Sequence, residues 1–152
     1  MDDVNKVLSQ LREIGVVNSN SGFYFLDELP VSAIDDRKAK ETLAVQELKK
    51  SERYTRLISR FPFVKAVCIS GSLSKGVMDK DGDVDYFIIT SKGRLWICRS
   101  LLIAFKKVFL LNSRKYFCTN YFVDENNMEI PDKSIFTATE INYLKPVCNE
   151  NL

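Results

Sequence analysis

The sequence predicts a mixed α/β domain, because two apolar runs of strand length lie among segments with helical periodicity. The two runs, residues 64–70 and 84–90, are continuous in hydrophobicity, which is typical of central strands buried on both faces. The chain has 152 residues, of which 45% are hydrophobic, so it is the size of one ordinary domain and can build a core.

The N-terminal segment predicts a small helix-hairpin unit. Apolar residues recur at helical spacing over residues 4–14, and two short apolar stretches at 16–17 and 23–26 flank a polar turn. A winged-helix unit ends in the same order, so a winged-helix remnant and a simple flap are both open. We expect residues 1–30 to form this flap and residues 31–152 to form the main domain.

The main domain continues with helices and strands. Residues 32–60 are heavily charged with a sparse apolar stripe, which predicts a long surface helix whose basic residues lie in solvent. After the two apolar strands we expect a helix, a β-branched and aromatic strand, and a last helix, at residues 94–111, 116–123 and 134–144.

Composition excludes several function classes. Lys and Arg number 22 against 20 Asp and Glu, so the net charge of +2 gives no reason to expect a nucleic-acid or membrane partner. The chain has no histidine, which excludes catalysis by imidazole, and its four cysteines lack paired spacing and are expected to be reduced. The N-terminus does not resemble a signal peptide, and the longest apolar stretch, residues 95–111, contains basic residues. We therefore expect a soluble cytoplasmic protein.

A glycine-serine turn and two aspartates lie between the two apolar strands. Gly71 and Ser72 directly follow the first strand, where a small residue and a hydroxyl let the backbone approach a phosphate. Asp83 and Asp85 enter the second strand two residues apart, so both carboxylates are expected on one face. Two carboxylates this close favour a hard divalent ion such as Mg²⁺, and together with a phosphate cradle they indicate phosphoryl or nucleotidyl transfer.

An aspartate-rich calcium loop is an alternative interpretation of the same segment. Counted from Asp79, the sixth position is Val84 and the twelfth is Thr90, where an EF-hand needs glycine and glutamate. This alternative fails on spacing.

The segment ISGSLSKGVMDKDGDVDYFIIT resembles the glycine-serine and aspartate-x-aspartate signature of the nucleotidyltransferase fold superfamily, to which polymerase beta belongs. More closely, the chain looks like the nucleotidyltransferase-like domain proteins of bacteria and archaea, over roughly residues 10–148. The resemblance implies a central mixed sheet flanked by helices, with Gly71 and Ser72 on the triphosphate and Asp83 and Asp85 on Mg²⁺ or Mn²⁺. It also implies transfer of a nucleoside monophosphate from a nucleoside triphosphate to an acceptor hydroxyl of a nucleic acid, a protein or a small molecule.

The sequence departs from this family pattern at the third carboxylate, which active members usually supply from a neighbouring strand. Here the residue expected to point into the site from KYFCTNYFVDEN is Asn120, an uncharged amide and a poor base. Asp124 has the same parity and replaces it only if the chain bends or the strand register differs. Lys75, three residues after Ser72, either reaches the phosphates or lies in solvent.

Three function classes follow from these residues. The first is an active metal-dependent nucleotidyltransferase that uses Asp83, Asp85 and a third group such as Asn120. The second is a nucleotide-binding or regulatory module without turnover, and the third is a module that binds nucleic acid or protein. Related chains often continue into a helical domain that holds the acceptor, so we expect acceptor recognition to be reduced, absent, or supplied by a protein partner or a second copy.

Overall fold

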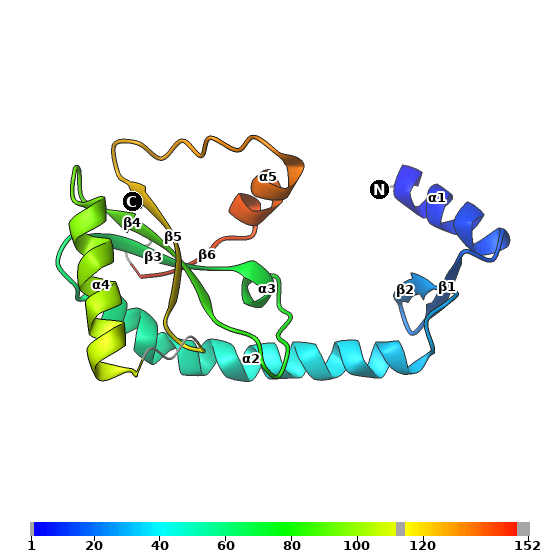
Figure 1. Cartoon of the computed structure of the whole chain (residues 1–152). Coiled ribbons are helices and arrows are strands. Elements are labelled where there is room, and N and C mark those ends of the chain that lie inside the picture. Colours follow the sequence, from blue (N-terminus) through cyan, green and yellow to red (C-terminus); the bar gives the residue numbers. More distant parts are fainter. Residues whose placement is uncertain (1, 112–114, 149–152) are drawn as a thin grey trace. The chain divides into compact units, whose positions relative to one another are not determined.

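The computed structural model describes residues 2–111 and 115–148, and the chain divides into two units, residues 1–39 and 40–152. The N-terminal unit holds α1 (Asp2–Glu13) and a hairpin of β1 (Val17–Asn20) and β2 (Phe23–Leu26). Helix α2 (Ser32–Ser59) begins in this unit and continues into the second. The predicted helix, hairpin and long charged helix are therefore all present (Figure 1).

The hairpin turn is tighter than the sequence suggests. Residues 18–20 were expected in the polar turn, but Asn20 pairs with Phe23 as the last rung of the hairpin. The turn consists of Ser21 and Gly22 alone, with φ angles of 52° and 83°. Two consecutive positive φ angles match the right-handed twist of the paired strands, which is why a two-residue turn suffices.

The second unit is built on a four-stranded mixed sheet with the strand order β5-β4-β3-β6. Strand β3 pairs antiparallel with β4 and β6, whereas β4 pairs parallel with β5. The strands are β3 (Val64–Ser70), β4 (Asp85–Thr90), β5 (Cys118–Asp124) and β6 (Lys145–Cys148), and the further helices are α3 (Gly71–Ser74), α4 (Leu95–Phe109) and α5 (Ile135–Asn142). The predicted fold class, a mixed α+β domain with a central mixed sheet flanked by helices, is confirmed.

Strand β6 is the element that the sequence did not predict. It follows α5 almost immediately and contains Pro146, which cannot donate a backbone hydrogen bond. Because β6 lies at the edge of the sheet, the missing donor breaks no ladder on its outer side.

The two faces of the sheet have different roles. On one face, the cross-strand pairs Val67–Ile88 and Ile69–Tyr86 are buried and belong to the core with side chains of α2 and α4. On the other face, Ser70 lies opposite Asp85 and Cys68 opposite Phe87. The main core therefore leaves this second face available for a site.

Burial on both faces, which the sequence suggests for both central strands, holds for β3 alone. Residues 66–70 of β3 are all buried, but buried and half-buried residues alternate along β4. Tyr86 is fully buried, whereas Asp85 and Phe87 lie on the less covered face. The apolar run of β4 concealed this alternation, because an aromatic residue on a site face resembles core.

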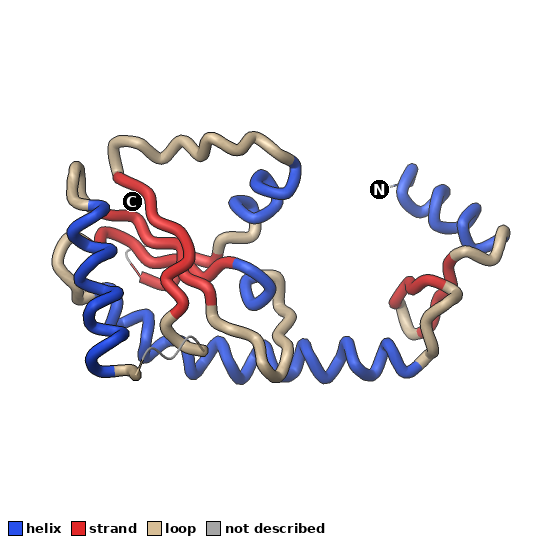
Figure 2. Tube along the Cα trace, viewed as in Figure 1, coloured by secondary structure: helices blue, strands red, loops and turns tan. Residues whose placement is uncertain are grey.

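A long connection, residues 125–134, leads from the end of β5 to α5 (Figure 2). Helix α5 is capped by Ser134, whose hydroxyl accepts a hydrogen bond from the Thr137 amide. None of the residues of α5 is buried. This helix is thus attached to the unit by few contacts, over the face that carries Asp85 and Phe87.

Packing between α4 and the sheet predicts unequal effects of two neighbouring substitutions. Leu102 is 0% exposed in the core and Leu101 is 40% exposed. Leu102→Ala should cost about 2–5 kcal/mol of unfolding free energy, because it leaves a cavity, and should lower the Tm by about 5–15 °C. Leu101→Ala is the matched control and should change the Tm by about 2 °C or less in thermal unfolding followed by circular dichroism. Equal effects would contradict this packing.

Candidate functional site

The backbone of Gly71 lies directly against the side chain of Asp85. The pairing of β3 with β4 places Ser70 opposite Asp85, so the turn after β3 begins beside the carboxylate at the start of β4. Gly71 has a φ of 69°, and a Cβ atom there would lie 2.7 Å from Asp85 Oδ2. Only glycine fits both this conformation and this space, so the glycine of the sequence motif is required by the carboxylate it faces.

Asp85 lies in an acidic environment. Burial raises the pKa of the Asp85 carboxyl, a hydrogen bond from the Cys118 thiol lowers it, and the charges of Asp83 and Glu140 raise it further. Burial and the neighbouring Asp85 carboxylate also raise the pKa of Cys118, to about 11, so this thiol is protonated at neutral pH. The ionised Asp85 side chain is therefore repelled by Asp83 and Glu140, and a cation bound there would relieve this repulsion.

Asp83 lies in the loop that precedes β4, not within the strand. It is half-buried and close enough to Asp85 to influence its ionisation. Among residues 2–111 and 115–148, no three Cys, Asp or Glu side chains converge as a ready metal cluster. The oxygen donors that could share a cation are thus the two carboxylates, together with an amide oxygen from β5.

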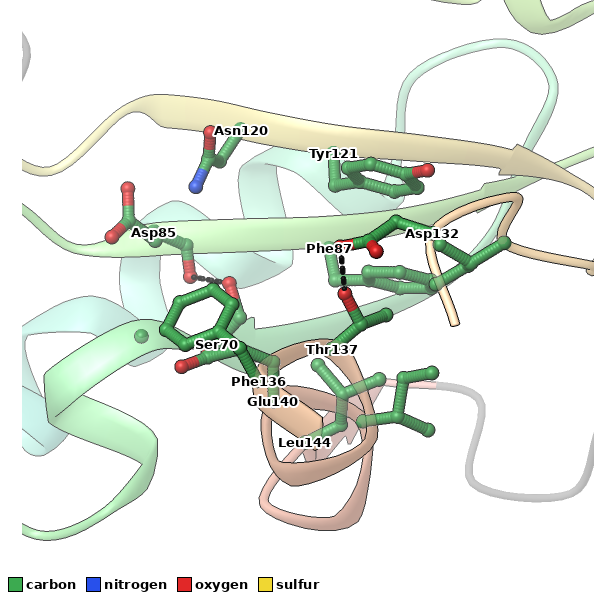
Figure 3. Close-up of a pocket in the computed structure, with 13 residues that line it drawn as sticks. Ser70, Asp85, Phe87, Asn120, Tyr121, Asp132, Phe136, Thr137, Glu140 and Leu144 are labelled. Atoms are coloured by element: carbon green, nitrogen blue, oxygen red, sulfur yellow. Dashed lines mark hydrogen bonds between the residues drawn. The ribbon is translucent and has the colours of Figure 1, made fainter. Parts of the chain in front are cut away.

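That amide belongs to Asn120, which the structure places at the site. The register between β4 and β5 shifts after Tyr86, so that Phe87 pairs with Tyr121 and Asn120 becomes the extra residue of a β-bulge. Asn120 and Tyr121 consequently line the same cavity although they are consecutive (Figure 3). In Figure 3 the Asn120 side chain lies beside that of Asp85.

Asp124 lies at the far end of β5 and cannot replace a carboxylate at Asn120. It pairs with Thr90, five residues along β4 from Asp85. Its carboxylate accepts hydrogen bonds from the amide of Gly93, in the loop after β4, and from the amide of Asn126, in the turn after β5. The alternative that invoked Asp124 as the third ligand is therefore wrong.

A cavity of about 370 Å³ opens beside Asp85 on this face of the sheet. Its floor includes Phe87 and Tyr121, whose rings stack with centroids 5.5 Å apart and an interplanar angle of 8° (Figure 3). Its wall is formed by α5 and the preceding loop, in which the Asp132 carboxylate accepts a 2.6 Å hydrogen bond from Thr137. Ser70 and Gly71 also line the cavity, and both lie next to Asp85.

The predicted phosphate-binding residues Ser72 and Lys75 lie on the Gly71 side of Asp85. Ser72 is exposed in the short helix α3, and neither it nor Lys75 is among the residues that line the cavity. Lys75 forms an ion pair with Glu140 of α5, with the two side chains 31% and 24% exposed. The lysine is therefore not simply in solvent, and it links α3 to α5.

Sequence reasoning missed three groups of this site. Phe87 lies two residues after Asp85, and alternate residues of a strand point to the same face, so the sequence could have placed it on the face of Asp83 and Asp85. Tyr121 faces the cavity only because of the bulge, and Glu140 lies 65 residues from its partner Lys75. No local pattern marks either of them.

A mixed sheet that places a glycine-serine turn beside a pair of aspartates is typical of transferases that act on nucleotides. A family model described as nucleotidyltransferase domain matches residues 51–145. This range contains β3, β4 and β5 and ends at Lys145, the first residue of β6. The chain belongs to this nucleotidyltransferase domain family, and the predicted resemblance is confirmed. No curated protein and no solved structure matches the chain.

Membership of this family implies a nucleotide substrate and the general reaction of nucleoside monophosphate transfer. Within the part of the chain that the structure describes, none of the helices is long and apolar enough to cross a membrane.

The crowding of negative charge around Asp85 predicts that removing its charge stabilises the metal-free protein. Above its raised pKa, Asp85 is ionised beside Asp83 and Glu140. In EDTA at pH 7, Asp85→Asn should raise the Tm by about 1–3 °C, since a solvent-screened repulsion is worth on the order of 0.5–1 kcal/mol.

This effect depends on pH in a defined direction. A carboxyl whose pKa is raised on folding favours the folded state when protonated, and this contribution is lost as the pH rises through the folded pKa. The Tm difference between Asp85→Asn and the unmodified chain should therefore become smaller as the pH is lowered from 7 to 4. Asp81→Asn, in the exposed part of the same loop, is the control. A lower Tm for Asp85→Asn at pH 7 would refute this electrostatic account.

Proposed function

We propose that this protein is a metal-dependent nucleotidyltransferase that moves a nucleoside monophosphate from a nucleoside triphosphate to an acceptor hydroxyl. The observation that carries the proposal is the contact of Gly71 with Asp85, because it joins the glycine-serine turn and the carboxylate pair at one point. In the reaction the acceptor oxygen bonds to the α-phosphorus, and the bond from that phosphorus to the bridging oxygen breaks. Pyrophosphate leaves with the electron pair, and the hydroxyl proton passes to water.

The donor set of the site suits Mg²⁺ or Mn²⁺. Asp83 and Asp85 are hard oxygen donors whose mutual repulsion a cation would relieve, and Mg²⁺ commonly uses one or two carboxylates with substrate phosphates. Asn120 would offer its amide oxygen as a neutral third donor. Such an ion, when bound, neutralises the charge that develops on the phosphate oxygens.

The chain's own residues divide the remaining tasks. Gly71 and Ser72 would hold the triphosphate through backbone amides and a hydroxyl, because the turn that they begin lies directly against Asp85. Lys75 would bind the β- or γ-phosphate as a point charge and would exchange its Glu140 partner for the nucleotide. Helix α5 would limit the access of water to the reacting atoms.

Labelling of an acceptor tests the proposed activity. The protein should transfer label from an α-³²P-labelled nucleoside triphosphate, tested one by one, to a component of a cell extract in Mg²⁺ or Mn²⁺. Asp83→Ala should lower the labelling at least about 100-fold, because a cation-binding carboxylate is lost. Asp81→Ala removes an exposed carboxylate from the same loop and should leave labelling within about twofold.

The same experiment separates catalysis from binding alone. Asn120 is a poor base and the carboxylate of β5 lies at the strand's other end, so a nucleotide-binding module without turnover has specific support. A Tm that rises with Mg²⁺ and nucleotide, without any labelling, would establish that second function. If none of the common nucleoside triphosphates gave either labelling or a thermal shift, both functions would be rejected.

The ion pair between Lys75 and Glu140 predicts opposite effects of its two partners on nucleotide affinity. Glu140→Gln releases Lys75 and removes a negative charge, so MgATP should bind about fivefold more tightly. Lys75→Met should weaken MgATP about tenfold. Isothermal titration calorimetry measures both.

Glu129→Gln breaks the exposed Glu129–Lys133 pair and serves as the control, with an expected change of less than twofold. If Lys75→Met bound MgATP as tightly as the unmodified chain, Lys75 would have no role in phosphate binding.

A further inference from the structure

The cavity beside Asp85 is more apolar than the proposed phosphate chemistry requires. Beyond Asp85 and Asn120, its lining is dominated by six apolar or aromatic side chains, namely Phe87, Tyr121, Ile130, Phe136, Ile141 and Leu144. Its volume of about 370 Å³ suits a small molecule.

The charged groups of the cavity are all of one sign. Among the described residues that line it, the charged side chains are Asp85, Asp132 and Glu140, all carboxylates. Lys75 neutralises Glu140 from outside this lining. An anion inside the cavity would be repelled, so the triphosphate belongs beside Ser72 and Lys75, which lie outside this lining, and the cavity is left to the second substrate.

Hydrogen-bonding capacity favours an acceptor over a nucleobase in this space. Carboxylates only accept hydrogen bonds, and the hydroxyls of Ser70 and Thr137 already donate to the Asp85 carbonyl and to Asp132. Among the described residues that line the cavity, the side-chain donors that remain for the ring nitrogens and carbonyls of a base are the Asn120 amide and the Tyr121 hydroxyl. A ligand whose own groups donate, through a hydroxyl or an ammonium, fits better.

Two apolar side chains of α5 also remain uncovered at the cavity. Phe136 and Ile141 line it, yet they are 69% and 46% exposed. An apolar ligand would cover them and gain the free energy of that burial.

We propose that this cavity binds the acceptor, and that the acceptor is a small hydroxyl compound with an aromatic or aliphatic body and a neutral or positive charge. The inference rests on the proposed function and adds the class of its second substrate. The hydroxyl points toward Asp85, its oxygen bonds to the α-phosphorus as pyrophosphate leaves, and its proton passes to water.

Three probes that have the same phenol ring and differ in charge test the class of ligand. Tyramine, tyrosol and 3-(4-hydroxyphenyl)propionate carry a positive, a neutral and a negative end on the same two-carbon chain. Titration of the full chain by ligand-observed NMR should show tyramine binding about fivefold or more tightly than the propionate, with tyrosol between them. A preference for the anion, or no binding of any probe while Mg²⁺ and nucleotide still raise the Tm, would overturn the proposal.

Two adjacent residues of α5 test the location. Phe136→Ala should weaken tyramine about fivefold or more, whereas Ile135→Ala should not change its binding, because Ile135 is 88% exposed and does not line the cavity. Ile141→Ala is a second cavity variant and should also weaken tyramine. Equal tyramine affinity in the Phe136 and Ile135 variants would overturn the assignment.

Nucleotide binding separates this inference from the function on which it rests. Phe136→Ala should keep the thermal shift with Mg²⁺ and nucleotide. If the unmodified chain showed neither that shift nor any labelling, the proposed function itself would be rejected. Displacement of tyramine by adenosine would make the cavity a base site, and exclusive labelling of protein in an extract would make the acceptor a macromolecule. Either result would overturn the inference.

Discussion

The contact between the backbone of Gly71 and the carboxylate of Asp85 is the constraint on which the site depends. It exists because β3 and β4 pair with Ser70 opposite Asp85, so the end of one strand meets the start of the other. A methyl group at residue 71 would lie 2.7 Å from a carboxylate oxygen. The two halves of the proposed site, the turn for phosphates and the acid for a cation, are held together by this pairing without any flexible side chain between them.

Around this contact the charges separate into two regions. Lys75 supplies a cation on the side of α3, whereas the cavity beyond Asp85 is lined by carboxylates and apolar groups. Helix α5 connects the regions, since Glu140 meets Lys75 and Phe136 reaches the cavity. In the proposed reaction this division gives an anionic donor and an uncharged or cationic acceptor separate places, which meet at Asp85.

Strand parity predicts some residues of the site face correctly, whereas hydrophobicity misleads for another. Parity placed Asn120 toward the site, and the structure has it beside Asp85. Asp124 has the same parity but lies four residues further along β5, and it pairs with Thr90, so the bulge at Asn120 does not bring it to Asp85. Phe87 has the parity of Asp85, but hydrophobicity alone cannot distinguish an aromatic cavity floor from a core residue.

The sequence by itself determined the order of most elements, the two central strands, and the Gly71, Ser72, Asp83 and Asp85 pattern that marks the family. These are encoded by spacing within about twenty residues, where periodicity and turn chemistry act directly. Only the tertiary structure decided that the glycine is needed because Asp85 faces it, that edge strand β6 forms despite Pro146, and that Glu140 reaches Lys75. The physical reason is that strand pairing and the placement of α5 depend on contacts between distant segments, which no local pattern records.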